Sequence, residues 1–254
     1  MTLFDCNVCF GSFSVPPLQR VETAEALVAE MSHCGISRAL VRHAAQIDES
    51  PEVGNPLLCR LVAPHPELVA SWAILPFETG ELGDLPQFLQ AMRQHDVRAL
   101  WAYPSRHRYL LNATTFGELF EEMTRRRIPL LLPKQEQSGG RAGWDLADAI
   151  LGDFPSLRLI VVGHGSWGED RYFRPLMRRY EGFCVDTSRY ELDGGIAAAC
   201  AAHGPERLLF GTAYPYTGMG GAMLTLLHAD MPDEWKVAVA GGNLQRLLDE
   251  VNLG

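Results

Sequence analysis

The chain has 254 residues, of which 47% are hydrophobic and 21% are charged, and its formal net charge is −9. The acidic balance argues against a nucleic-acid partner, which requires clustered Lys and Arg, and no apolar stretch is long enough to span a bilayer. The opening five residues carry no signal-like apolar run and the six cysteines are scattered, so we expect reduced thiols, a cytoplasmic location and one domain over residues 1–254.

Short apolar runs alternate with helical patterns from end to end, which indicates a parallel sheet wrapped by helices. Residues 157–162, for example, are apolar at all but one position, as strands buried on both faces require. The predicted strands are Leu3–Phe10, Arg38–Arg42, Val69–Leu75, Val97–Tyr103, Ile128–Leu132, Leu157–Val162, Phe183–Ser188 and Arg207–Gly211.

Helices are predicted between these strands because apolar residues recur there with i, i+3, i+4, i+7 spacing. Thr115 and Glu118 have capping-box spacing and are expected to open one such helix. The apolar stripes are Ala24, Leu27, Val28 and Met31; Phe116, Leu119, Phe120 and Met123; and Leu244, Leu247, Leu248 and Val251.

Eight strands that alternate with helices predict an α/β fold closed into a (β/α)8, or TIM, barrel. An open, doubly wound sheet is the alternative. No Gly-rich phosphate-binding sequence follows any predicted strand, which weakens that alternative.

Several segments resemble the amidohydrolase superfamily, in the branch of aminocarboxymuconate-semialdehyde decarboxylase-like and dicarboxylate-lactonase-like enzymes. The first strand of that branch reads Asp-x-His-x-His-x-Gly, and residues 5–11 here read Asp-Cys-Asn-Val-Cys-Phe-Gly. The further matching segments, in chain order, are residues 127–132, 159–165, 208–215 and 242–248. The resemblance implies a TIM barrel that hydrolyses or decarboxylates small molecules.

The resemblance also implies a divalent metal, but this chain departs from the pattern at its ligand positions. Asn7 and Cys9 stand where the branch has its paired His, Pro133 where it has a third His, and Ala213 where it has an Asp. A metal site needs about three or four suitable donors, and Pro and Ala supply none. We therefore expect no metal and no other cofactor. His164 keeps the residue that contacts the metal-bound water in relatives.

Catalytic groups of a barrel lie at the carboxyl ends of its strands, which points to His164, Asp5 and Asp186. His164, in Gly163-His164-Gly165, would act as a base, oriented by Asp5 or Asp186. The alternatives are a histidine held by hydrogen bonds and, for Asp186, a structural ion pair with Arg189 or Lys134.

Asp5, Asn7 and Cys9 share strand parity and are expected to point into the barrel. Cys9 beside a His could form a thiolate, although a small buried hydrophobe is favoured. Cys6 and Cys9, three residues apart, should face opposite sides of the strand, so their Cys-x-x-Cys spacing is read as accidental.

A small-molecule pocket with aromatic walls is expected at the mouth of the barrel. Packing within loops is the alternative for each aromatic residue. The other histidines are expected at the surface. The candidate substrate-binding residues are Asn7, Cys9, Tyr103, Lys134, Trp167, Arg189 and Tyr214, with Lys134 and Arg189 as sites for an anionic group.

Two functions are compatible with these features. The first is an enzyme that hydrolyses an ester, lactone or amide, or decarboxylates a small carboxylate, without the family's metal. The second is a non-catalytic barrel that binds a small molecule or a protein partner, since barrels host unrelated activities. A homodimer is compatible with either function.

Overall fold

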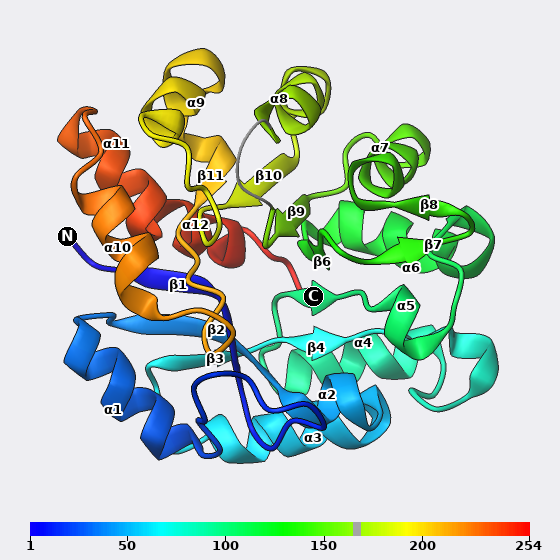
Figure 1. Ribbon diagram of the computed structural model, residues 1–254. Helices are drawn as coiled ribbons and strands as arrows, with labels where there is room; N and C mark the ends of the chain where they lie inside the picture. Colours follow the sequence, from blue (N-terminus) through cyan, green and yellow to red (C-terminus); the bar gives the residue numbers. More distant parts are fainter. Residues whose placement is uncertain (165–168) are drawn as a thin grey trace.

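The computed structural model describes residues 1–164 and 169–254. Parallel strands form a closed barrel and helices surround it, which confirms the predicted (β/α)8 architecture (Figure 1). The barrel strands are β1 (Phe4–Phe10), β2 (Arg38–His43), β3 (Leu68–Ala70), β4 (Trp72–Ala73), β5 (Leu100–Trp101), β6 (Leu130–Pro133), β9 (Leu159–Val162), β10 (Phe183–Asp186) and β11 (Leu208–Leu209).

The ring of strands closes at two joints. β3 and β4 are the two parts of the predicted strand 69–75: β3 pairs with β2 and β4 with β5. Between them, the Ser71 N–H donates to the Val41 carbonyl at 3.1 Å, so the segment passes from one neighbour to the other. At the second joint, between the first and last strands, the Cys6 N–H donates to the Phe210 carbonyl at 2.9 Å and the Cys9 N–H to the Tyr214 carbonyl at 2.8 Å.

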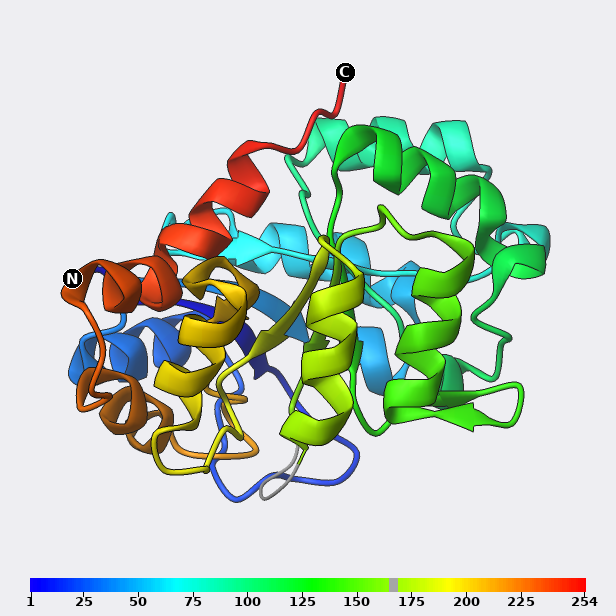
Figure 2. The ribbon, with the colours of Figure 1, turned by 90° about the horizontal axis from the view of Figure 1, so that it is seen from above.

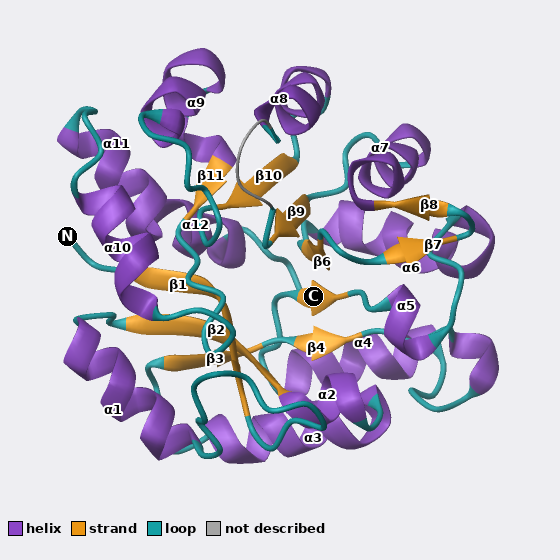
Figure 3. Ribbon diagram, viewed as in Figure 1, coloured by secondary structure: helices purple, strands orange, loops and turns teal. Residues whose placement is uncertain are grey.

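Helices cover the outside of the barrel, and a small antiparallel hairpin, β7 (Gln137–Ser138) with β8 (Arg141–Ala142), follows β6 (Figure 3). The helices are α1 (Ala24–Cys34), α2 (Ala44–Asp48), α3 (Pro51–Val62), η1 (Phe77–Thr79), α4 (Leu85–Gln94), α5 (Pro104–His107), α6 (Ala113–Arg126), α7 (Gly143–Asp153), α8 (Asp170–Arg179), α9 (Gly195–His203), η2 (Pro205–Arg207), α10 (Met219–Leu227), α11 (Asp233–Val237), η3 (Ala238–Gly242) and α12 (Asn243–Asp249).

Two predicted helix boundaries are wrong. The capping box expected at Thr115 and Glu118 does not open α6, because Asn112 caps the helix three residues earlier and its side chain accepts the Thr115 N–H at 3.1 Å. Asn is among the strongest N-capping residues, so the helix begins at the first position where Asn can cap it. α12 ends at Asp249, before Val251, although Val251 is buried as expected.

Two hydrophobic layers hold the barrel together. The inner layer fills the barrel with side chains that include Phe4, Cys6, Leu40, Trp101 and Leu131, and the leucines of α12 belong to it. The outer layer packs the other faces of the strands against the helices. α12 lies at one end of the barrel and the loop after β1 at the other (Figure 2). None of the helices described is both long and apolar enough to cross a membrane.

Candidate active site at the barrel mouth

A bulge in β1 decides which of its side chains reach the barrel mouth. Asp5 is paired with Ala39 and Val8 with Val41, so three steps along β1 match two along β2. The extra residue resets the alternation of side chains. Cys6 therefore lies in the inner layer, while Asn7 and Cys9 both lie beside Arg42, at the end of β2. The expectations that Asp5 shares the orientation of Asn7 and Cys9, and that Cys6 and Cys9 face opposite sides, are wrong for this reason.

Asp5 joins the first and last strands. Its Oδ1 accepts the N–H of Asn7 at 2.9 Å and that of Thr212 at 3.0 Å, and its Oδ2 accepts the Thr212 hydroxyl at 2.5 Å. Burial outweighs these donors and raises the pKa of Asp5 to about 6. Asp5 thus stabilises the contact between β1 and the segment after β11 from within the protein.

A linear polar network crosses the mouth from β10 to β2. Asp186 accepts the Asn7 side-chain amide at 2.8 Å and the Gly163 N–H at 2.9 Å, and the Asn7 oxygen accepts from Arg42 at 2.7 Å. The Arg42 guanidinium also lies over the Trp101 ring, 4.1 Å from its centroid. Arg42 is only 6% exposed, and its nearest hydrogen-bonded partner is the neutral Asn7 amide.

Cys9 lies beside the Arg42 guanidinium and is fully buried. Burial raises the pKa of its thiol to about 11, although the guanidinium opposes this shift. At neutral pH Cys9 is therefore a neutral acid and not the thiolate that a cysteine nucleophile requires.

Tyr103 stacks on Trp101 with the ring planes 2° apart and the centroids separated by 6.0 Å. Its N–H donates to the Tyr109 hydroxyl at 2.8 Å. Its own hydroxyl is buried and meets no hydrogen-bonding atom in the described part of the chain. Burial raises the pKa of Tyr103, so the hydroxyl stays protonated and can donate.

His164 is fully buried among aromatic rings. Its ring centroid lies 5.0 Å from that of Tyr190, 5.2 Å from that of Phe173 and 6.4 Å from that of Trp144. The oxygens of Asp5 and Asp186 accept the backbone and side-chain hydrogen bonds given above. The catalytic roles predicted for His164, Asp5 and Asp186 stay predictions.

The two cations predicted to bind an anionic group already have carboxylate partners. Lys134 Nζ lies 3.0 Å from Glu169, and Arg189 Nε lies 3.4 Å from Glu191. Tyr214 is buried in the outer layer and not at the mouth. Trp167 lies outside the described residues.

The sequence reasoning missed Arg42 and Tyr216 as site residues. Arg42 closes the apolar strand Ala39-Leu40-Val41, and a charge at the carboxyl end of a barrel strand is the signal that points to it. Tyr216 contacts Phe13 with ring centroids 5.6 Å apart. It also lies near enough to Cys9 and Arg42 for both to perturb its pKa. His43 and His107, expected at the surface, are also largely enclosed, and burial lowers the pKa of both.

The side chains at the expected ligand positions do not fit a divalent metal. The Asn7 amide is engaged on both sides, Cys9 is protonated, and Pro133 and Ala213 have no donor atom. The Arg42 cation lies against two of these positions and would repel a second cation. In residues 1–164 and 169–254, no three His, Cys, Asp or Glu side chains are grouped to hold a metal ion.

These features define a (β/α)8 barrel with a buried polar network at the carboxyl ends of its strands. Residues 142–249 match the amidohydrolase family, and the resemblance predicted from the sequence motifs is confirmed. No curated protein sequence matches this chain.

Solved structures of similar fold cover nearly the whole chain. A 2,6-dihydroxybenzoate decarboxylase from Rhizobium has a TM-score of 0.75 at 14% identity and covers 98% of both chains. A dihydroxybenzoic acid decarboxylase from Polaromonas, solved with manganese and 2-nitroresorcinol, has a TM-score of 0.73 at 14% identity and covers 98% of this chain and 97% of that one. A Pseudomonas putida protein assigned as a 2-pyrone-4,6-dicarboxylic acid hydrolase has a TM-score of 0.71 at 13% identity and covers 98% of both.

Proposed function

We propose that this chain is an amidohydrolase-type enzyme that decarboxylates a small carboxylate at the barrel mouth without a divalent metal. The observation that carries the proposal is the pair formed by Arg42 and Cys9, a buried cation and a buried neutral acid. Two of the expected metal-ligand positions, Asn7 and Cys9, lie against this cation. The likeness in fold to aromatic-acid decarboxylases supports the same conclusion.

The chemistry of the mouth favours decarboxylation over hydrolysis. Loss of CO2 breaks a carbon–carbon bond and leaves the electron pair on the remaining carbon, which must then receive a proton. The Cys9 thiol can donate that proton and recover one from solvent. Hydrolysis needs a base that activates water, and neither the protonated Cys9 thiol nor the Arg42 cation can serve as one.

The test is release of CO2 by the purified full chain from a panel of hydroxybenzoates and small dicarboxylates. We expect turnover that EDTA does not reduce, in protein that contains no stoichiometric metal by mass spectrometry. Cys9→Ala should lower kcat by roughly 100-fold or more, the usual contribution of a positioned acid. Cys34→Ala, on the partly exposed face of α1, is the matched control and should leave kcat unchanged.

Other outcomes would overturn the proposal. Activity that EDTA abolishes and manganese restores would show that a metal does the chemistry. Hydrolysis of a lactone or ester without release of CO2 would make the chain a hydrolase.

A second candidate function is binding without catalysis, and the packing of His164 favours it. A histidine enclosed by Trp144, Phe173 and Tyr190 contributes to the core and is poorly placed to exchange protons with a substrate. Binding of a carboxylate with no turnover across the panel would support this candidate.

A further inference from the structure

Two hydrogen-bond donors at the barrel mouth are buried without an acceptor. They are Nε of Arg42 and the hydroxyl of Tyr103, neither of which meets a partner among the described residues. Arg42 is 6% exposed and Tyr103 is 4% exposed, so bulk water does not satisfy them. A buried donor without a partner destabilises the folded state, and two together call for an acceptor that binds between them.

The two donors belong to one site. Both side chains pack on the indole of Trp101, Arg42 at 4.1 Å and Tyr103 at 6.0 Å from its ring centroid. The Arg42 charge also opposes the rise that burial causes in the pKa of Tyr103, so the two groups lie within electrostatic reach of each other.

The charge at the site is not balanced by direct contact. Asp186 is separated from the guanidinium by the Asn7 amide, and within residues 1–164 and 169–254 no carboxylate accepts a hydrogen bond from Arg42. The predicted anion-binding cations, Lys134 and Arg189, are already paired. Arg42 is therefore the cation whose environment favours an additional anion.

We propose that Arg42 and Tyr103 form a carboxylate-binding subsite, in which the guanidinium supplies the positive charge that the amidohydrolase resemblance assigns to a metal. A carboxylate has two acceptor oxygens and can take the Arg42 Nε–H and the Tyr103 O–H together. We expect the ligand to enter past Tyr216, which follows β11, is 45% exposed and lies near enough to Arg42 and Cys9 for them to perturb its pKa.

The subsite rests on the proposed function and deepens it, because it states which group of the substrate is held. During decarboxylation, negative charge moves from the leaving carboxylate to carbon. A fixed cation on the leaving group would stabilise the substrate more than the transition state and slow the reaction. The carboxylate held by Arg42 is therefore an anchor that remains with the product, so the members of the panel expected to turn over are the dicarboxylates.

The test uses sodium benzoate and its neutral isostere benzamide, with affinity measured by calorimetry and Tm by a thermal scan. We expect benzoate to bind the full chain and raise its Tm, and benzamide to do neither. Tyr103→Phe should weaken benzoate binding by roughly tenfold or more, since a hydrogen bond to a charged group is lost. Its Tm without ligand should stay the same or rise, because the hydroxyl has no partner in the protein.

Tyr180→Phe is the matched control, because its hydroxyl donates to Asp148 on the outer helices, and benzoate affinity should not change. Arg42→Lys keeps the charge but loses the planar pair of donors, so it should also weaken benzoate binding. Equal binding of benzoate and benzamide, or unchanged benzoate affinity in Tyr103→Phe, would overturn the subsite. Benzoate binding without turnover of any carboxylate would leave the subsite standing and remove the proposed function.

Discussion

Two arginines of β2, Arg38 and Arg42, lie at opposite ends of the barrel in similar surroundings. Each guanidinium covers an aromatic ring, Arg38 at 4.5 Å from Phe4 and Arg42 at 4.1 Å from Trp101. Each also donates to a neutral side-chain amide, of Gln245 and Asn7 respectively. The difference is solvent, since Arg38 is partly exposed and Arg42 is buried.

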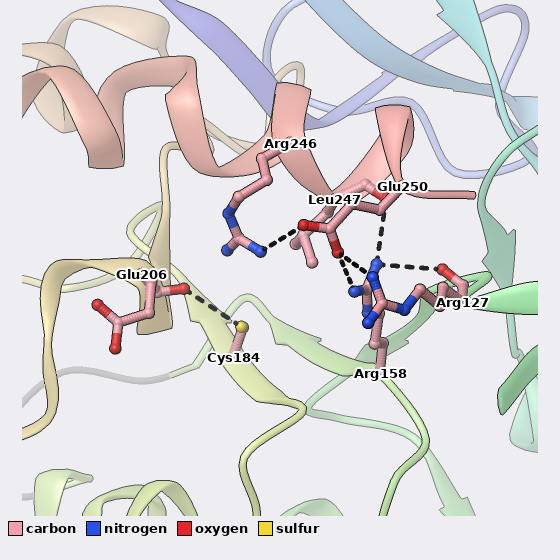
Figure 4. A network of polar contacts seen from close by, with 7 residues as sticks. All are labelled: Arg127, Arg158, Cys184, Glu206, Arg246, Leu247 and Glu250. Carbon is pink, nitrogen blue, oxygen red and sulfur yellow. Dashed lines mark hydrogen bonds and ion pairs between the residues drawn. The ribbon is translucent and has the colours of Figure 1, made fainter.

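The surrounding charges differ in the same way. At the Arg38 end, Glu250 forms ion pairs with Arg127, Arg158 and Arg246 in a partly exposed cluster (Figure 4). At the Arg42 end, the Asp186 carboxylate is linked to the guanidinium only through the Asn7 amide, which bonds to both. Loss of one partner of a solvent-exposed charge costs little stability, because water replaces that partner. Loss of one partner of a buried charge costs much more, because no water takes its place. Burial, rather than the contacts alone, distinguishes the two ends of the barrel.

The largest expected difference is between Asp186→Ala and Glu250→Ala. Loss of Asp186 leaves the Asn7 amide and the Gly163 N–H unpaired beside a buried cation, so we expect a decrease of about 3–5 kcal/mol in unfolding free energy. Loss of Glu250, whose side chain is 29% exposed, should cost about 1 kcal/mol or less. Urea denaturation of both variants measures the difference, and equal losses would contradict the comparison.

The next largest effect is a pH dependence from Asp5. Its pKa is raised from 3.8 to about 6 in the folded state, so the native protein binds more protons than the unfolded chain between these values. Unfolding free energy should therefore fall as pH rises from about 4 to 6, by up to about 3 kcal/mol, and this contribution should be constant above pH 6. Asp5→Asn, which cannot titrate, should flatten this part of the stability profile. An unchanged slope in the variant would assign the pH dependence to another group.

The smallest effect concerns close approach at Gly211. A Cβ there would lie 2.7 Å from Asp186 Oδ2 and 3.2 Å from Cys6 Sγ, so Gly211→Ala should cost about 1–3 kcal/mol. Gly220, in α10, has open space around it, and Gly220→Ala should be neutral or stabilise by up to about 1 kcal/mol. Thermal unfolding of the two variants should separate them, and a neutral Gly211→Ala would mean that Asp186 can move.

The fold was predictable because its signal is repeated along the chain. Continuous apolar segments such as Leu159–Val162 can be buried only within a covered parallel sheet, and the helical stripes between them supply the cover. The strand bounds were less predictable. The division of 69–75 at Ser71 depends on a hydrogen bond to a neighbouring strand, which no local pattern reports.

The site was predictable in part. Asn7, Cys9, Tyr103 and Asp186 do meet at the mouth, because strand order and polarity bring the carboxyl ends together. The bulge in β1 contains no Gly or Pro that would indicate it in the sequence. The prediction that Asp5 points the same way as Asn7 and Cys9 was therefore wrong. The ion pairs of Lys134 and Arg189 depend on loops, and only the fold shows that Arg42 donates to the neutral Asn7 amide.

The contacts between β1 and β11 are expected to form late in folding. Asp5 and Thr212, which hold this joint, are separated by 207 positions in sequence. Contacts that distant carry a large loop-closure entropy and tend to form late. Protection of the Cys6 and Cys9 amides from hydrogen exchange should therefore develop after that of the local helices. A partly folded intermediate would have its helices formed while β1 and β11 are still unpaired.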